Sequence, residues 1–181
     1  MAGTGQSERV WVGLQPPRVY VRVEGWATLK SAPALQAFAA KARAAGGRQF
    51  LFDLRGCAGM DSTFTGTVAG IGLEVQHDPQ GGLRLAGVSG RLAAALRLLG
   101  IDRLAQLQVE EGGAADGAWG LPESALSPLG GSETEAVSAR GVLEAHRNLA
   151  ALSEENRRRF EGVISCLEAE AGTPPPAPEK T

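Results

Sequence analysis

The sequence predicts an α/β fold, in which a mixed sheet of four to five strands packs with helices and two further helices follow near the C-terminus. Three observations predict it. Two early segments alternate valine with polar residues, residues 50–54 form a mostly apolar run, and stripes with helical spacing recur between the strand patterns. Strands that alternate with helices favour parallel central strands joined by right-handed crossovers.

The first two strands are predicted from side chains that alternate between two faces. The residues on the apolar face are Val10, Val12, Leu14, Val19, Val21 and Val23. Period two on β-branched residues is typical of strands, and the short turn at Pro16-Pro17 indicates a hairpin. We expect Gly25 to end the second strand and residues 1–8 to be a disordered N-terminus.

A helix and a buried strand follow the hairpin. Ser31 is expected to cap the helix, with Pro33 in the first turn, where a missing amide hydrogen costs little. Its apolar stripe consists of Leu35, Phe38, Ala39 and Ala42. The strand at 50–54 is too apolar to have a face in water, so we expect a central strand covered on both sides and a loop at 56–61.

The second helix is predicted to begin at Asp61-Ser62, which are good capping residue types. Its apolar stripe consists of Phe64, Val68, Ile71 and Val75. The glycines at Gly66, Gly70 and Gly72 weaken the helix by ~1 kcal/mol each relative to alanine, and they would let another backbone approach closely, either the sheet below or a partner.

The rest of the main domain is predicted from shorter patterns. Leu83 and Leu85 mark a strand, and residues 107–109 form an edge strand. Between them Ser89 caps a third helix, and Gly100 ends it.

The chain divides into five segments. They are the N-terminus 1–8, the main domain 9–110, a glycine- and proline-rich linker or loop 111–131, a helical extension 132–171 and a disordered tail 172–181. Ser132 and Glu135 form a capping box for a helix that runs to about residue 152 and has His146 among its candidate buried positions, and Ser153 caps a second helix. We expect this pair to cover a face of the domain; alternatively, it forms a homodimer or docks a partner.

Composition excludes several classes of function. With 181 residues, 43% of them hydrophobic, the chain suits one globular domain with an appendage. A net charge of −2 argues against nucleic-acid binding by bulk electrostatics. The N-terminus lacks a signal sequence and no apolar run approaches the ~20 residues of a membrane span, so we expect a cytoplasmic protein without membrane insertion.

The sequence predicts no metal, cofactor or catalytic site. Cys57 and Cys166 match no metal-ligand spacing and are expected to be reduced thiols. His77 follows Ser62 by about 15 residues on one predicted helix, which at ~1.5 Å per residue separates them by over about 20 Å. No base from His77 can therefore activate Ser62, and we expect a protein that is not an enzyme.

The segment from Phe52 to Ser62, Phe-Asp-Leu-Arg-Gly-Cys-Ala-Gly-Met-Asp-Ser, resembles the motif of STAS domains, the anti-sigma-factor antagonist family. Residues 82–89 and 96–104 resemble the last strand and helix of that family. The resemblance covers about residues 8–110. Phe64 stands where the family commonly has glycine, and the chain is similar to a variant group with Asp-Ser-Thr-Phe and a C-terminal helical extension.

The resemblance implies a STAS-like fold and partner switching in bacterial transcription regulation. In that scheme the unmodified domain binds an anti-sigma factor with serine kinase activity, or another signalling protein, and phosphorylation releases it. Ser62 would be the phosphate acceptor, with Thr63 and Thr65 as alternatives. The partner-binding residues would be Asp61, Ser62, Thr63, Phe64 and Gly66.

Other interpretations remain open from the sequence. Ser62 serves only as a helix cap in the simplest of them. In a second, the chain is a STAS subunit of a larger signalling or lipid-transport complex that works without phosphorylation. In a third, it senses a small ligand or nucleotide in a groove beside the Asp61 loop.

Overall fold

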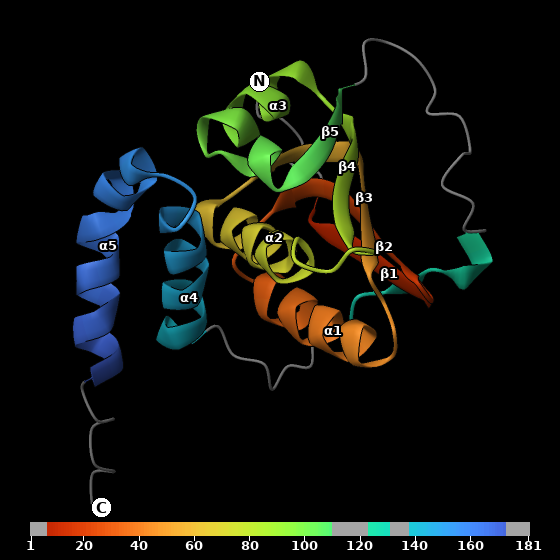
Figure 1. Cartoon of the computed structure of the whole chain (residues 1–181), viewed down its shortest axis with the longest axis horizontal. Coiled ribbons are helices and arrows are strands. Elements are labelled where there is room, and N and C mark those ends of the chain that lie inside the picture. The colour runs from red at the N-terminus through yellow and green to blue at the C-terminus, as the bar shows by residue number, and fades with distance from the viewer. Residues whose placement is uncertain (1–6, 110–122, 131–137, 173–181) are drawn as a thin grey trace, which may run out of the picture.

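The computed structural model describes residues 7–109, 123–130 and 138–172 (Figure 1). Its strands are β1 (Arg9–Gln15), β2 (Arg18–Ala27), β3 (Gln49–Met60), β4 (Gly82–Val88), β5 (Ala105–Val109) and β6 (Ser127–Pro128). Its α-helices are α1 (Ala32–Ala44), α2 (Ser62–Val75), α3 (Gly90–Leu98), α4 (Ala139–Ala150) and α5 (Glu154–Gly172). The predicted α/β class and the order of elements in the main domain are confirmed.

The strands form one mixed sheet in the order β5-β4-β3-β2-β1-β6. Strands β2 to β5 run parallel to one another, and β1 pairs antiparallel with β2 as the predicted hairpin. The sheet has six strands rather than four to five, because Ser127 and Pro128 pair with Val12 and Trp11 of β1. This part of the predicted linker therefore belongs to the sheet, and a strand of two residues has no periodicity by which to predict it.

Strands β2 and β3 are longer than predicted. Gly25 does not end β2 but lies within it at φ 75°, beside register shifts in the ladder with β3. The predicted loop at 56–61 is wrong up to Met60, because β3 continues through it. Gly59 makes this possible: a Cβ atom there would lie 2.6 Å from the Trp26 ring of the neighbouring strand. The strand thus leads directly to Asp61.

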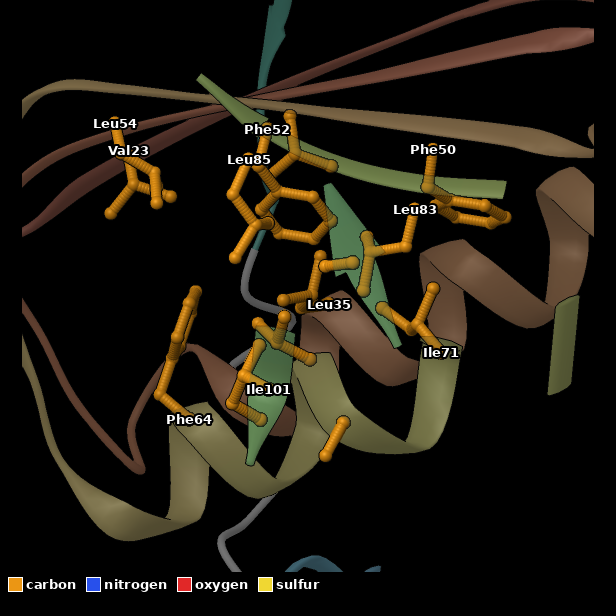
Figure 2. Packing of buried hydrophobic residues seen from close by; sticks show 14 of the residues in the cluster. Val23, Leu35, Phe50, Phe52, Leu54, Phe64, Ile71, Leu83, Leu85 and Ile101 are labelled. Atoms are coloured by element: carbon orange, nitrogen blue, oxygen red, sulfur yellow. The ribbon is translucent and has the colours of Figure 1, made fainter. Parts of the chain in front are cut away.

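Helices α1 and α2 pack on one face of the sheet and enclose the hydrophobic core (Figure 1). Figure 2 shows Phe64 extending from α2 toward the sheet, where Val23 and Leu54 lie. Leu35 of α1 joins the same cluster and is fully buried. The stripe predicted for α2 is therefore its core face, and the residues before Phe64 form the joint with β3.

In the main domain the ends of the helices match the predicted caps with one exception. Asp61 and Ser89 accept hydrogen bonds from the first turns of α2 and α3, and Gly100 follows α3 at φ 76°. Ser31 occupies the cap position of α1 without bonding to that helix, because its hydroxyl donates to the Glu8 carboxylate.

Glu8 makes specific hydrogen bonds, although it belongs to the N-terminal segment that is predicted to be disordered. Its carboxylate accepts hydrogen bonds from Thr28 N at 2.8 Å and from Thr28 Oγ1 at 2.7 Å. These bonds join the start of the chain to the loop between β2 and α1. The remainder of that predicted segment, residues 1–6, lies outside the described part of the chain.

The helical extension packs on the main domain. Helix α4 contacts α2, and α5 lies on the far side of α4 (Figure 1). Helix α4 begins at Ala139, where Ser138 Oγ accepts from Gly141 N at 3.0 Å, so the helix starts later than the capping-box pattern predicted. The capping box itself and the tail from residue 173 lie outside the described residues.

Candidate functional site

Asp61 connects three elements at the carboxyl end of β3. It has extended backbone angles, and its Oδ1 accepts a hydrogen bond from Phe64 N at 2.7 Å, which caps α2. Its Oδ2 accepts from Leu29 N at 2.6 Å, in the loop before α1. The carboxylate therefore holds the first turn of α2 and the β2–α1 loop in a fixed relation, with Ser62 at the first helical position.

Ser62 contacts a histidine from the helical extension. Ser62 is half-buried, and its Oγ lies 3.0 Å from His146 Nε2. His146 Nδ1 lies 2.8 Å from the carbonyl oxygen of Val142, which can only accept a hydrogen bond. In the neutral ring Nδ1 therefore carries the hydrogen, and Ser62 Oγ–H donates to Nε2.

This pair places a base beside Ser62 that the exclusion of His77 does not cover. His77 itself is exposed beyond the end of α2. The sequence predicts His146 as a buried position on a helix, and a buried imidazole needs hydrogen-bond partners. That requirement was the available signal; only the docking of α4 identifies Ser62 as the partner.

Ser62 and His146 provide two components of a nucleophilic site, a hydroxyl and a base. A hydroxyl donates to an imidazole, which is in turn oriented by the Val142 carbonyl. A substrate would also need access to Ser62, and α4 lies over it. Three clefts of the described structure are lined by other residues. The arrangement fits a contact between two parts of the chain better than it fits an open catalytic centre.

The remaining hydroxyls of the joint are less accessible than Ser62. Thr63 and Thr65 are 6% and 3% exposed. Thr65 Oγ1 donates to the carbonyl oxygen of Asp61 at 2.7 Å, inside the first turn of α2. The alternative acceptors therefore lie within the folded helix, and Ser62 stands at its edge.

Phe64 does not lie where the sequence interpretation placed it. Its side chain is fully buried in the core, so it cannot form part of the surface that a partner meets. The helical stripe had already predicted this position as apolar and inward. Replacement of the family's glycine at Phe64 therefore changes the packing under α2 and not its outer face.

Gly66 lies in the contact between α2 and α4. A Cβ atom on Gly66 would stand 2.2 Å from the carbonyl oxygen of Ala145, so the two backbones touch there. Asn148 Nδ2 donates to Gly66 O at 3.2 Å. The close backbone approach predicted for the glycines of this helix occurs at Gly66, and the second backbone there comes from the helical extension. At the other two glycines of the prediction the nearest atoms belong to side chains.

A ligand groove beside Asp61 was the expectation for a small-molecule sensor. The largest of the three clefts, about 640 Å³, lies instead at the amino ends of β3, β4 and β5, where Gln49, Gly82 and Ala105 line it. Asp61 follows the carboxyl end of β3, at the opposite edge of the parallel strands. This cleft therefore does not adjoin the Asp61-Ser62 joint.

Comparison with known proteins finds matches among solved structures. No protein-family model matches the sequence, and no curated protein matches it. Among solved structures, an anti-sigma factor antagonist from Mycobacterium paratuberculosis is similar, with a TM-score of 0.46 and 20% sequence identity. The match covers 56% of this chain and 86% of that one. At this identity the likeness concerns the fold alone.

Three further features of the described residues concern metal ligands, a buried thiol and membrane spans. Across residues 7–109, 123–130 and 138–172, no three side chains among His, Cys, Asp and Glu gather as ligands for a metal ion. Burial raises the pKa of the Cys57 thiol to about 11, so this cysteine is a protonated core residue at neutral pH. Among the helices that are described, none combines the length and the apolar character of a membrane span.

Asp53, the second residue of the STAS-like motif, is the centre of an ion-pair cluster on β3. Burial tends to raise its pKa, but Arg55 and Arg22 outweigh this and hold it below its usual value of 3.8. Arg55 donates to both carboxylate oxygens, at 2.9 and 2.6 Å, and Arg22 Nε lies 3.4 Å away. The folded state therefore binds the proton less tightly than the unfolded state does.

The ion-pair cluster at Asp53 predicts that the free energy of unfolding falls in acid. Because the folded pKa of Asp53 is depressed, its contribution is present above about pH 4 and is lost as pH falls through the folded value. We expect the free energy of unfolding, measured in urea between about pH 2 and pH 5, to fall less steeply for Asp53→Asn than for the unmodified chain. The exposed Asp102→Asn variant is the control, and parallel curves for Asp53→Asn would contradict the prediction.

Proposed function

We propose that the chain is a non-enzymatic regulatory module that binds a protein partner and is switched by phosphorylation of Ser62. One observation carries this: the Ser62 hydroxyl bonds to His146 of the extension, whereas the Thr65 hydroxyl bonds to the backbone of its own helix. A group added to Ser62 therefore acts on a contact between two parts of the chain and leaves the α2 backbone bonded.

The energetics favour a switch of binding over a change of fold. A phosphate on Ser62 adds about −1.5 to −2 charges at the N-terminus of α2, where the helix dipole favours an anion by ~0.3–1 kcal/mol. Repulsion from the Asp61 carboxylate opposes this. Inside a protein interface the same group leaves a desolvated charge, which costs roughly 2–5 kcal/mol. The larger effect therefore falls on binding.

The class of partner follows from the motif at residues 52–62, which resembles that of anti-sigma-factor antagonists. It supports an anti-sigma factor with serine kinase activity as the partner, and transcription regulation in the cytoplasm as the setting. No cofactor or metal enters this scheme.

An exposed apolar rim lies beside the joint and extends the proposed partner surface. Trp26 is 49% exposed and Leu29 is 39% exposed, although both are large apolar residues. Leu29 N donates to Asp61 Oδ2, so the rim is held next to Ser62. Large apolar side chains that stay in water next to a modifiable hydroxyl are typical of contact surfaces.

The test is affinity capture of the full chain from the cells that express it, followed by mass spectrometry. We expect phosphate on Ser62 and capture of a serine kinase of the anti-sigma class, with Ser62→Ala as the unphosphorylated control. Ser62→Asp should reduce capture about tenfold or more and leave the melting temperature within a few degrees.

Two outcomes would contradict the proposal. A large loss of melting temperature in Ser62→Asp with unchanged capture would mean that the residue serves only the fold. Equal capture of one stable complex by the unmodified chain and by Ser62→Asp, with no phosphate on Ser62, would favour a subunit of a larger assembly.

A further inference from the structure

Helix α4 lies on the face of α2 that carries Ser62, Gly66 and Gly70, which are spaced four apart and are called here the α2 outer face. The two helices meet at backbone distance at Gly66, where the nearest atom to an added Cβ is the carbonyl oxygen of Ala145. The side chain of Asn148 lies against Gly70 and donates to Gly66 O. Helix α4 thus occupies this face as a partner helix would.

The α2 outer face is built differently from the opposite side of the helix. The opposite side supplies the core residues Phe64, Val68, Ile71 and Val75. On the outer face Ser62, Gly66 and Gly70 contact α4 through a hydroxyl and two glycines. The extension also adds Leu149 of α4 and Phe160 of α5 to the hydrophobic core cluster. Departure of α4 would therefore leave the core residues of α2 and the sheet together, at the cost of exposing Leu149.

The hydrogen bond from Ser62 to His146 is the contact of this interface that a modification of Ser62 would remove. A phosphate ester on Oγ eliminates the donated hydrogen, and a separation of 3.0 Å leaves no room for a phosphoryl group between Oγ and Nε2. His146 is 5% exposed, its Nδ1 is held by Val142 O, and its ring meets Phe160 edge-on with centroids 5.5 Å apart. The ring has no ready alternative position, so α4 must shift.

The Asp61 carboxylate does not make room for the phosphate. Both oxygens of the neighbouring Asp61 carboxylate are engaged by backbone N–H groups, so this carboxylate stays in place and repels the phosphate. If the ring nevertheless stays, Nε2 is left buried without its donor. Leaving a buried hydrogen-bond acceptor without its donor changes the equilibrium constant for the docking of α4 by about tenfold or more.

We propose that α4 is an internal competitor for the α2 outer face, held there by the Ser62–His146 hydrogen bond and displaced when Ser62 is phosphorylated. This rests on the proposed function, because it takes Ser62 as the phosphate acceptor. The external partner on this face is a protein that presents a helix with a small residue at the place of Ala145. Because it binds once α4 has left, it is a second partner, distinct from the anti-sigma factor that phosphorylation of Ser62 releases. While α4 is docked, the apparent affinity for this second partner is its intrinsic affinity multiplied by the fraction of chains whose outer face is free.

A second attachment of the extension does not involve Ser62. Asn156 Nδ2 donates to Leu99 O at 2.8 Å and to Leu149 O at 2.9 Å, between the start of α5, the end of α3 and the end of α4. Phosphorylation leaves these groups chemically unchanged. Its direct effect should therefore be concentrated where α4 crosses the first turns of α2.

The experiment uses the full chain with phosphoserine installed at position 62 during translation, and it measures hydrogen–deuterium exchange. We expect the amides of α4 to exchange about tenfold faster or more than in the unmodified chain, while those of β3 keep their protection. His146→Ala should speed α4 exchange in the same direction without adding charge, and phosphoserine 62 should add little in that variant. Phosphoserine at Ser89, an exposed serine at the start of α3, is the matched control and should leave α4 unchanged.

Three results would overturn the inference. Exchange in α4 that is unchanged or slower with phosphoserine 62 would mean that the phosphate does not displace the helix. Equally faster exchange in β3 would mean that it acts on the fold. Fully additive effects of phosphoserine 62 and His146→Ala would mean that their hydrogen bond is not the coupling. Absence of phosphate on Ser62 in cells would instead contradict the proposed function and would leave the measured coupling intact.

Discussion

Replacing Phe64 by alanine is expected to lower the free energy of unfolding by about 3–5 kcal/mol. The side chain is fully buried between α2 and the sheet, so its removal loses apolar burial and leaves a cavity among residues such as Val23 and Leu54 (Figure 2). Urea denaturation of the full chain measures the effect, and the loss is expected whether or not a partner is present.

The control for this prediction is Leu98→Ala on α3. Leu98 is 62% exposed, so we expect its truncation to change stability by no more than about 0.5 kcal/mol. If Phe64→Ala were equally mild and instead abolished partner capture, Phe64 would belong to a contact surface, as the sequence resemblance implied, and its burial would be wrong.

Gly66→Ala is expected to destabilise the docked extension, although alanine favours a helix over glycine by ~1 kcal/mol. The added methyl would meet the Ala145 backbone, with its carbonyl oxygen at 2.2 Å and its carbonyl carbon at 2.6 Å. Backbone atoms cannot rotate away, so α4 must move as a whole. Overpacking of this kind costs about 1–3 kcal/mol, and we expect faster hydrogen exchange in α4 together with a net loss of stability.

Gly70→Ala is the matched control, one turn further along the same face. There the methyl would meet the end of the Asn148 side chain at 2.5 Å, and a side-chain amide can rotate away. The gain in helix propensity should then roughly offset the loss of the Asn148 bond to Gly66, so that stability changes by less than about 1 kcal/mol. Equal behaviour of the two variants would contradict backbone contact between α2 and α4.

Local patterns predicted the main domain well where the structure depends on neighbours in sequence. Alternating valines predicted the hairpin, and Asp61, Ser89 and Gly100 were correctly placed at helix ends, because capping involves residues within one turn. The stripe at Phe64 also predicted an inward side chain. The error at Phe64 came from preferring the family comparison to the periodicity.

The predictions were wrong where a residue bonds or pairs with a segment that is distant in the sequence. Gly25 and the predicted loop at 56–61 suggested strand ends, yet β2 and β3 continue there and pair with each other. Glycines occur where the two strands approach too closely for a side chain. Ser31 has the right type and place for a cap, but its hydroxyl is taken by Glu8 from another part of the chain. The segment at 127–128 gained strand structure only from β1.

The sequence by itself determined the α/β class, the order of elements from β1 to β5 and the joint at Asp61-Ser62, since periodicity and capping act over a few residues. Only the tertiary structure decided what that joint meets. Ser62 and His146 are 84 residues apart in the sequence, and the packing of two amphipathic helices brings Ser62 Oγ to 3.0 Å from His146 Nε2. That packing brings the backbones of Gly66 and Ala145 into contact, a fit between two helix surfaces that hydrophobic patterning along one helix does not encode.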